Sequence, residues 1–435
     1  MTACQNRSNA DGFCDLYRGA MGIFHVKGRI NMLTSLALIF LLGIVLGGIF
    51  NKIKLPGLLG MIVAGILLGP YVLNLLDDSI FDISAYLMRI ALIIILIRVG
   101  LSLDIKDLKR VGRPAVMMCF VPACFEMVGV IIFAPYILGI SIIDAAIMGA
   151  VLGAASPAII VPKMIHLMEN RIGTDKSIPQ MMMAGTSVDG VFVIIVFTAF
   201  IGFGQGEKIS ASGFVQIPAS IAIGAISGIA IGLLVGFFIT KIHMRDSLKV
   251  ILMLSISFLF IALETILPIP FSGLIAVIGM AVTLQIKKTE ASTRISIKFS
   301  KLWIAAEILL FVLVGATVDL NYVLSAGIPV IIVIFIALAF RLAGVFCCVI
   351  KTRLSMNERL FCMIAYIPKA TVQAAIGSIP LSIGMSCGNI VLTVAVLAIL
   401  ITAPLGAIGI DIAQKRLLAR ENTTGSGQMS LSPDA

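Results

Sequence analysis

The amino-acid sequence predicts an all-α polytopic membrane protein with about thirteen transmembrane helices. Of its 435 residues, 60% are hydrophobic and only 12% are charged, whereas a soluble domain carries about 25% charged residues. Apolar runs of roughly 20 residues, the length at which a helix crosses a bilayer, recur along the chain with short connections. Basic residues are concentrated in every second connection. Together these patterns exclude a separate soluble domain.

The predicted spans divide the chain into one membrane domain and two tails. Residues 33–412 form the transmembrane domain, and residues 413–435 form a polar C-terminal tail in the cytoplasm. Residues 1–32 lack the apolar segment and cleavage site of a signal peptide. We interpret them as a disordered tail or as an extension from an upstream start site. In chain order the spans are predicted near 33–50, 55–75, 84–103, 114–138, 141–167, 179–203, 214–240, 249–267, 270–286, 302–318, 325–350, 358–383 and 388–411.

The charges in the connections predict the orientation. Connections on one side of the predicted membrane carry 23 basic residues, and those on the other side carry one, Lys208. Because basic residues accumulate in cytoplasmic loops, the basic side is predicted to be cytoplasmic. An odd number of spans then places the N-terminus outside and the C-terminus inside. This topology accounts for the net charge of +10, so nucleic-acid binding is not expected.

A weak internal repeat indicates two halves of opposite orientation. Residues 56–65 (PGLLGMIVAG) resemble residues 270–279 (PFSGLIAVIG). An odd number of spans separates the two segments, so the halves run through the membrane in opposite directions. Inverted repeats of this kind build secondary transporters, whose sites lie near the midplane where helices break. Counted from the first proline of each segment, the matching positions are Glu126 with Arg341, and Ser156-Pro157 with Pro368-Lys369.

Two proline-containing segments are predicted to break their helices. Proline removes a backbone N–H and clashes with the preceding turn. Pro157 and Pro162 predict an unwound segment around residues 155–157, and a second break is predicted at Pro368. Two broken helices that cross near the midplane leave free carbonyls and helix ends that can hold a cation. The second segment also holds polar side chains, of which Lys369 is expected to offset the negative helix ends: Lys369, Thr371 and Gln373.

Asp189 is the main candidate for a functional residue. It is the only ionisable residue between Lys176 and Glu207, which places it at bilayer depth, where an aspartate costs about 2.5–3.5 kcal/mol. Such a group indicates an ion or proton pathway, or else a carboxylate that is paired only to fix helix packing. Arg341 is an always-charged group in mid-helix and needs a carboxylate partner, for which Asp189 and Glu126 both qualify.

The remaining unusual residues are interpreted as structural. Arg89 and Arg98 lie toward the ends of their span, and Glu307 is expected to pair with Arg98. The eight cysteines mostly fall inside apolar runs, and the three histidines lie far apart, so neither a zinc site nor a disulfide framework is predicted. No cofactor is expected, and no nucleophile–base pair within the spans indicates an enzyme.

Five motifs resemble the monovalent cation:proton antiporters of the sodium/proton exchanger superfamily, and the short tails resemble its compact bacterial members. This resemblance implies a homodimer in the bacterial plasma membrane. It also implies a dimerisation half and a core half, with the two crossed broken helices in the core and an elevator-like movement of that core. By the same resemblance, Arg341 pairs with Asp189. The motifs are residues 55–60 (LPGLLG), 98–104 (RVGLSLD), 155–157 (ASP), 187–189 (SVD) and 368–377 (PKATVQAAIG).

One position departs from the pattern of this family. Its members carry two adjacent aspartates, or an asparagine followed by an aspartate, and the second acid binds the ion; here the second position is Gly190. We predict exchange of a monovalent cation for protons at Asp189, with Ser156 and Thr186 completing the site. Na⁺ is the first candidate, and Li⁺ and K⁺ remain open. The alternative prompted by Gly190 is a non-transporting homologue with a binding or regulatory role. The sparse polar lining disfavours a symporter of organic anions.

Overall fold

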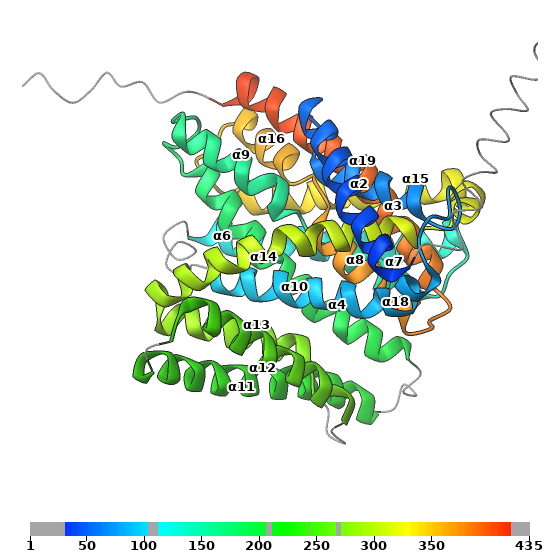
Figure 1. Cartoon of the computed structure of the whole chain (residues 1–435). Helices are drawn as coiled ribbons and strands as arrows, with labels where there is room; N and C mark the ends of the chain where they lie inside the picture. The colour runs from blue at the N-terminus through cyan, green and yellow to red at the C-terminus, as the bar shows by residue number, and fades with distance from the viewer. Residues whose placement is uncertain (1–30, 103–111, 206–210, 243, 267–270, 419–435) are drawn as a thin grey trace, which may run out of the picture.

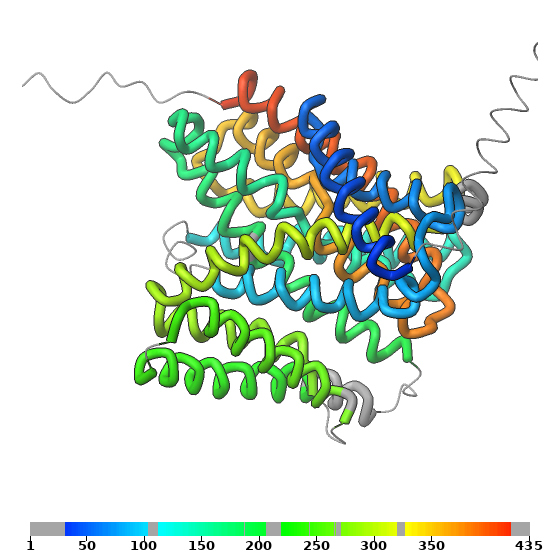
Figure 2. The backbone as a smooth tube through the Cα atoms, in the orientation of Figure 1, coloured from blue at the N-terminus to red at the C-terminus, as the bar shows by residue number. Residues whose placement is uncertain are grey.

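The computed structural model describes residues 31–102, 112–205, 211–242, 244–266 and 271–418, and these ranges are built almost entirely from helices (Figures 1 and 2). Within the described ranges, 10 helical segments are long and apolar enough to cross a membrane, and two shorter apolar helices accompany them. The prediction of an all-α polytopic membrane protein is confirmed. The count of thirteen spans stays a prediction, and residues 1–30 of the predicted N-terminal tail lie outside the described ranges.

One group of helices, which we call the scaffold, packs mainly on itself. The most extensive contacts within it join α11 to α13, and α14 to both α3 and α4. The scaffold consists of α2 (Met32–Lys52), α3 (Gly57–Leu68), α4 (Asp78–Ser102), α11 (Ala211–Lys241), α12 (Asp246–Ile266), α13 (Gly273–Lys287) and α14 (Thr289–Ala316).

The second group, which we call the core half, contains the helix breaks. In it α7 packs on α8 and α15, while α19 packs on α8, α15 and α16. The core half consists of α6 (Arg113–Met118), α7 (Val121–Leu138), α8 (Ile142–Leu152), α9 (Pro157–Glu169), α10 (Ile178–Gly204), α15 (Leu320–Val349), α16 (Met356–Ala365), α17 (Thr371–Gly377), α18 (Ile379–Ser382) and α19 (Gly388–Leu417).

The helix order agrees with the predicted inverted repeat. The segment from α2 to α10 and the segment from α12 to α19 each contribute helices to the scaffold and then to the core half, and α11 connects them. The first segment has its break between α8 and α9, and the second has its break between α16 and α17. The two breaks predicted at Pro157 and Pro368 are therefore present, one in each repeat.

A third break was not predicted. The sequence suggested one continuous span over residues 114–138, but α6 ends at Met118 and α7 begins at Val121. Pro122 explains this difference, because it has no N–H to donate to the carbonyl of Met118 four residues earlier. Other bounds differ as well: α14 begins at Thr289, well before the predicted start at residue 302, and α19 continues through Leu417.

Close helix packing in the scaffold depends on glycine. Gly224, Gly228 and Gly232 lie one turn apart on α11 and face the α13 side of the interface. A Cβ at Gly228 would lie 2.3 Å from the carbonyl oxygen of Ala276 on α13. Backbones that approach this closely need small residues, as is common between membrane helices.

We expect Gly228→Ala to destabilise the scaffold by about 1–3 kcal/mol, the usual cost of overpacking a close interface. Gly236→Ala is the matched control, because on the same helix the nearest contact of its Cβ would be Leu284 Cδ1, at 3.7 Å. Thermal unfolding of the purified variants in detergent measures the effect. Equal melting temperatures for the two variants would show that the α11–α13 approach does not depend on glycine.

Candidate ion-binding site

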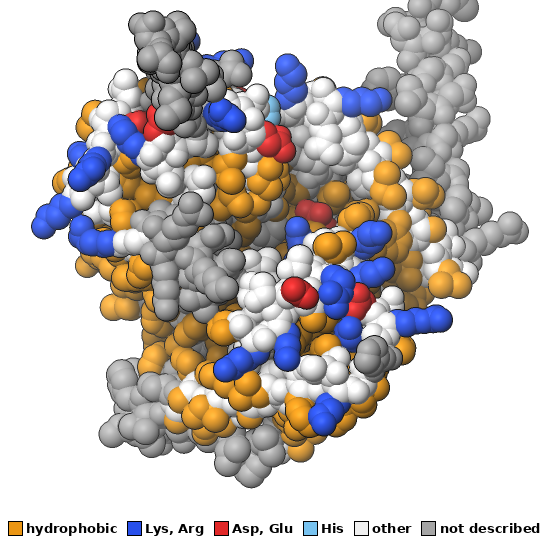
Figure 3. Space-filling view, turned by 90° about the vertical axis from the view of Figure 1, so that its left-hand side faces the viewer, with side chains coloured by type: hydrophobic (Ala, Val, Ile, Leu, Met, Phe, Trp, Pro, Cys, Tyr) orange, Lys and Arg blue, Asp and Glu red, His pale blue; other side chains and the backbone are white. Residues whose placement is uncertain are grey.

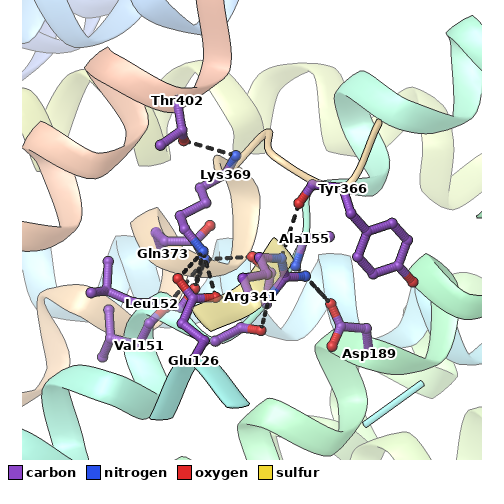
Figure 4. Close-up of polar contacts among 12 residues, drawn as sticks. Glu126, Val151, Leu152, Ala155, Asp189, Arg341, Tyr366, Lys369, Gln373 and Thr402 are labelled. Carbon is purple, nitrogen blue, oxygen red and sulfur yellow. Dashed lines mark hydrogen bonds and ion pairs between the residues drawn. The ribbon is translucent and has the colours of Figure 1, made fainter. Parts of the chain in front are cut away.

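The two breaks of the core half meet each other directly. The backbone N–H of Ser156, between α8 and α9, donates to the carbonyl of Pro368, between α16 and α17, with an N–O distance of 2.9 Å. Each break leaves the end of one helix and the start of another at the same place (Figure 4). The sequence forms these breaks because Pro157 begins α9 and Pro368 lies in the segment before α17.

Polar side chains from the other elements satisfy the free carbonyls at the C-terminal end of α8. Lys369 Nζ donates to the carbonyl of Leu152 at a distance of 2.5 Å, and Arg341 Nη1 donates to the carbonyl of Gly153 at a distance of 2.5 Å. Gln373 Nε2 donates to the carbonyl of Ala154 over 2.8 Å. A helix C-terminus is electronegative, so two cations and an amide are favourable there.

Four ionisable side chains form one buried network, and all four are 0% exposed. Arg341 Nη1 lies 2.8 Å from Glu126 Oε2 and its Nη2 lies 2.9 Å from Asp189 Oδ2. Lys369 Nζ lies 2.6 Å from Glu126 Oε1. The network therefore joins Arg341 to both of the carboxylates that the sequence left as alternatives. With all four groups ionised, its two positive and two negative charges sum to zero.

The carboxylate of Asp189 is satisfied on one oxygen only. Its Oδ2 accepts hydrogen bonds from the backbone N–H of Ala155, over 2.7 Å, and from Arg341. Its Oδ1 is buried and has no hydrogen-bond partner among the side chains and backbone that the structure describes. The hydroxyl of Ser156 is in the same condition. Buried polar atoms are normally paired, so these two oxygens are candidates for binding a proton or a cation.

The other predicted residues lie around this place with different functions. The Thr186 hydroxyl, one turn from Asp189 on α10, donates to the carbonyl of Met182 over 2.6 Å and keeps its lone pairs. Thr371 is buried as the first residue of α17, and no described hydrogen bond joins it to Asp189. At Gly190 an added Cβ would meet a single atom within 4 Å, the side-chain Cγ2 of Val372 at 3.3 Å.

Two further ionisable residues inside the predicted spans lie in the scaffold. Arg98 on α4 and Glu307 on α14 interact electrostatically, as the sequence suggested. Sequence reasoning missed Tyr366, whose carbonyl accepts from Arg341 Nε over 2.9 Å. Its position directly before the Ile367-Pro368 break was the available signal, because a residue at a helix end exposes its carbonyl.

Comparison with known proteins places the chain in a family. The family model for the transmembrane region of sodium/hydrogen exchangers matches residues 36–414. The chain belongs to the sodium/hydrogen exchanger family. Human sodium/hydrogen exchanger 9B2 is 32% identical over 411 residues, which cover 89% of this chain and 75% of that protein. Human sodium/hydrogen exchanger 9B1 is 30% identical over 427 residues, with 92% and 81% covered.

A solved structure agrees with the fold of this exchanger. The sodium proton antiporter MjNhaP1 from Methanocaldococcus jannaschii, at pH 8, superposes with a TM-score of 0.77 at 21% identity, and covers 89% of this chain and 98% of its own. The antiporter fold is therefore confirmed. Family membership and fold together support exchange of a cation for protons, and they place the chain among secondary transporters rather than enzymes.

Proposed function

We propose that this protein exchanges a monovalent cation, with Na⁺ as the first candidate, for protons through the carboxylate of Asp189. The observation that carries the proposal is that the buried Oδ1 of Asp189 and the hydroxyl of Ser156 have no hydrogen-bond partner in the part of the chain that the structure describes. Carboxylate and hydroxyl oxygens are ligands of hard cations, and the same carboxylate oxygen can hold a proton instead. Thr186 adds a third oxygen one turn away on α10.

Exchange follows from competition at one site. A proton and a monovalent cation each add one positive charge to the network, so replacing one by the other leaves the charge of the site unchanged. One-for-one, electroneutral exchange is the consequence. The charged and polar groups of the network all come from the core half, on α7, α10, α15 and the two breaks. The core half could therefore carry the site as a unit against the scaffold, which would give alternating access.

We further propose the orientation, location and assembly that the sequence indicated. Figure 3 shows the face of the molecule where the C-terminal ends of α4, α9 and α11 lie. Lys and Arg side chains gather on this face, with few acidic ones. The positive-inside rule assigns such a face to the cytoplasm, with the N-terminus outside. A bacterial plasma membrane and a homodimer remain proposals, and the two relatives described above are human proteins.

We expect wild-type protein in everted membrane vesicles to collapse an imposed proton gradient when Na⁺, Li⁺ or K⁺ is added, and Asp189→Asn to abolish this response. The substitution keeps the shape of the side chain but removes the charge that attracts the cation. Recovery of a pH-sensitive dye measures the exchange. Asp82→Asn, at an exposed position of α4, is the control and should exchange like wild type. Full activity of Asp189→Asn would place the ion site elsewhere.

A second function is favoured by one feature of the same site. The buried network is already neutral without a bound ion, and Gly190 stands where the family has its second acid. A folded wild-type protein that responds to none of the three cations, from mildly acidic to alkaline pH, would support a non-transporting homologue with a binding or regulatory role.

A further inference from the structure

Tyr366 joins two helix breaks through its side chain. It is 0% exposed at the end of α16, and its hydroxyl donates to the carbonyl of Met118 at the end of α6 over 3.2 Å. That carbonyl is free because Pro122, four residues later, has no N–H to offer it. The hydroxyl of Tyr366 therefore replaces a hydrogen bond that α6 and α7 cannot make themselves.

The same hydroxyl lies against α10 one turn before Asp189. A Cβ at Gly185 would lie 2.6 Å from Tyr366 Oη and 2.7 Å from Met118 Cβ, so a glycine is needed where the three elements meet. The Tyr366 side chain also lies close to that of Thr186. Residues 185 and 189 are four apart and share one face of the helix. Tyr366 thus covers Asp189 on one side.

Tyr366 also contacts Arg341, whose guanidinium pairs with Asp189. The Arg341 Cζ lies 5.2 Å from the centre of the Tyr366 ring, within the range of a cation–π interaction. Arg341 Nε donates to the Tyr366 carbonyl over 2.9 Å. Figure 4 shows the Tyr366 carbonyl directed at Arg341, with the Tyr366 ring on the same side of Arg341 as Asp189. A movement of Tyr366 would therefore shift Arg341 and uncover Asp189 together.

The apolar side chains that pack around Tyr366, on the side of Met118, are suited to such a movement. A separate buried apolar cluster, which we call the methionine-rich cluster, lies there and includes Tyr366 itself. Methionine is unbranched and adapts to changes in packing more easily than other apolar residues. Its fully or mostly buried methionines are Met118, Met164, Met181 and Met182, and Met117, Met183 and Met363 pack against it.

We propose that Tyr366 is a positioning residue that blocks access to Asp189 from the side of the methionine-rich cluster. Breaking the hydrogen bond between its hydroxyl and the Met118 carbonyl opens this access. The inference rests on the proposed function, in which Asp189 is the ion site, and it adds the group that controls access. The loop charges predict that this side faces the cytoplasm.

Native cysteines provide the test. Cys119 and Cys348 are buried on the side of Met118, whereas Cys387 is buried in the larger apolar cluster. Purified full-length protein is treated with N-ethylmaleimide, and mass spectrometry measures the labelling rate of each cysteine. Tyr366→Phe removes only the hydroxyl, and Gly185→Ala pushes Tyr366 and Met118 apart from α10. Tyr136→Phe, at a residue 88% exposed, is the matched control.

We expect Tyr366→Phe and Gly185→Ala to speed labelling of Cys119 and Cys348 about two- to tenfold, the range that one lost hydrogen bond implies. Labelling of Cys387 should stay at the wild-type rate in both variants, and Tyr136→Phe should change none of the three. Equal acceleration of all three cysteines would indicate general loosening and overturn the proposal, as would unchanged rates in both variants. The assay needs no transport, so its outcome is independent of whether Asp189 carries an ion. If Tyr366→Phe does not fold, Gly185→Ala gives the answer alone.

Discussion

Replacing Arg341 by methionine is expected to destabilise the protein more than any other single change at the site. The variant keeps the apolar stem but leaves Asp189 with one backbone donor, and Glu126 with Lys369 alone. The carbonyls of Gly153 and Tyr366 also lose their donor. Removing one partner of a buried ion pair costs about 3–5 kcal/mol, because the remaining charge stays buried without compensation.

Thermal unfolding in detergent, together with the yield of monodisperse protein, measures this loss. Arg294→Met is the matched control, since Arg294 pairs with Asp246 while 55% of its side chain is exposed, and such surface pairs contribute about 0–1 kcal/mol. In the double variant Arg341→Met with Asp189→Asn, one unpaired charge is gone, so part of the stability should return. If Arg341→Met unfolds at the wild-type temperature, the buried network does not hold the two breaks together.

The fold could be predicted because a bilayer restricts the choices of the chain. With no water to satisfy a free backbone in the hydrocarbon region, an apolar run of sufficient length must form a helix, and Pro157 and Pro368 then have to break theirs. The repeat was detectable because both halves place proline and charge at matching positions. The break at Met118 escaped prediction because proline is tolerated inside membrane helices, so that Pro122 alone does not distinguish a kink from a break.

The site was predictable in its residue types but not in its contacts. An isolated Asp189 and an always-charged Arg341 both require partners at bilayer depth, which is visible in the sequence. The Arg341 guanidinium contacts both Asp189 and Glu126, whereas Lys369 contacts only Glu126 of these two. These pairings depend on side-chain distances that residue spacing does not predict. Tyr366 acts through a carbonyl, which its position before the Ile367-Pro368 break could have indicated, and through a ring face, which leaves no pattern in the sequence.

Gly190→Asp is expected to strengthen cation binding and to raise the rate of exchange, or to create exchange if the wild type has none. The present network has no net charge when all four groups are ionised. A second acid would make the empty site negative, so that one bound proton or one bound cation restores neutrality. There is nearly enough room, because a Cβ at this position would meet only one methyl group, Cγ2 of Val372, at 3.3 Å.

In Gly190→Asp, a cation-dependent rise of the melting temperature and a faster exchange in vesicles should occur together. An additional unpaired aspartate at bilayer depth costs about 2.5–3.5 kcal/mol, so the variant should melt below wild type without added cation. A cation present at about 100 times its dissociation constant contributes about 2.7 kcal/mol, which would recover most of that loss. Gly190→Asn adds similar bulk without charge and should show neither the cation-dependent recovery nor faster exchange. If Gly190→Asp folds but gains no cation dependence, then an acid at position 190 is not what the site lacks.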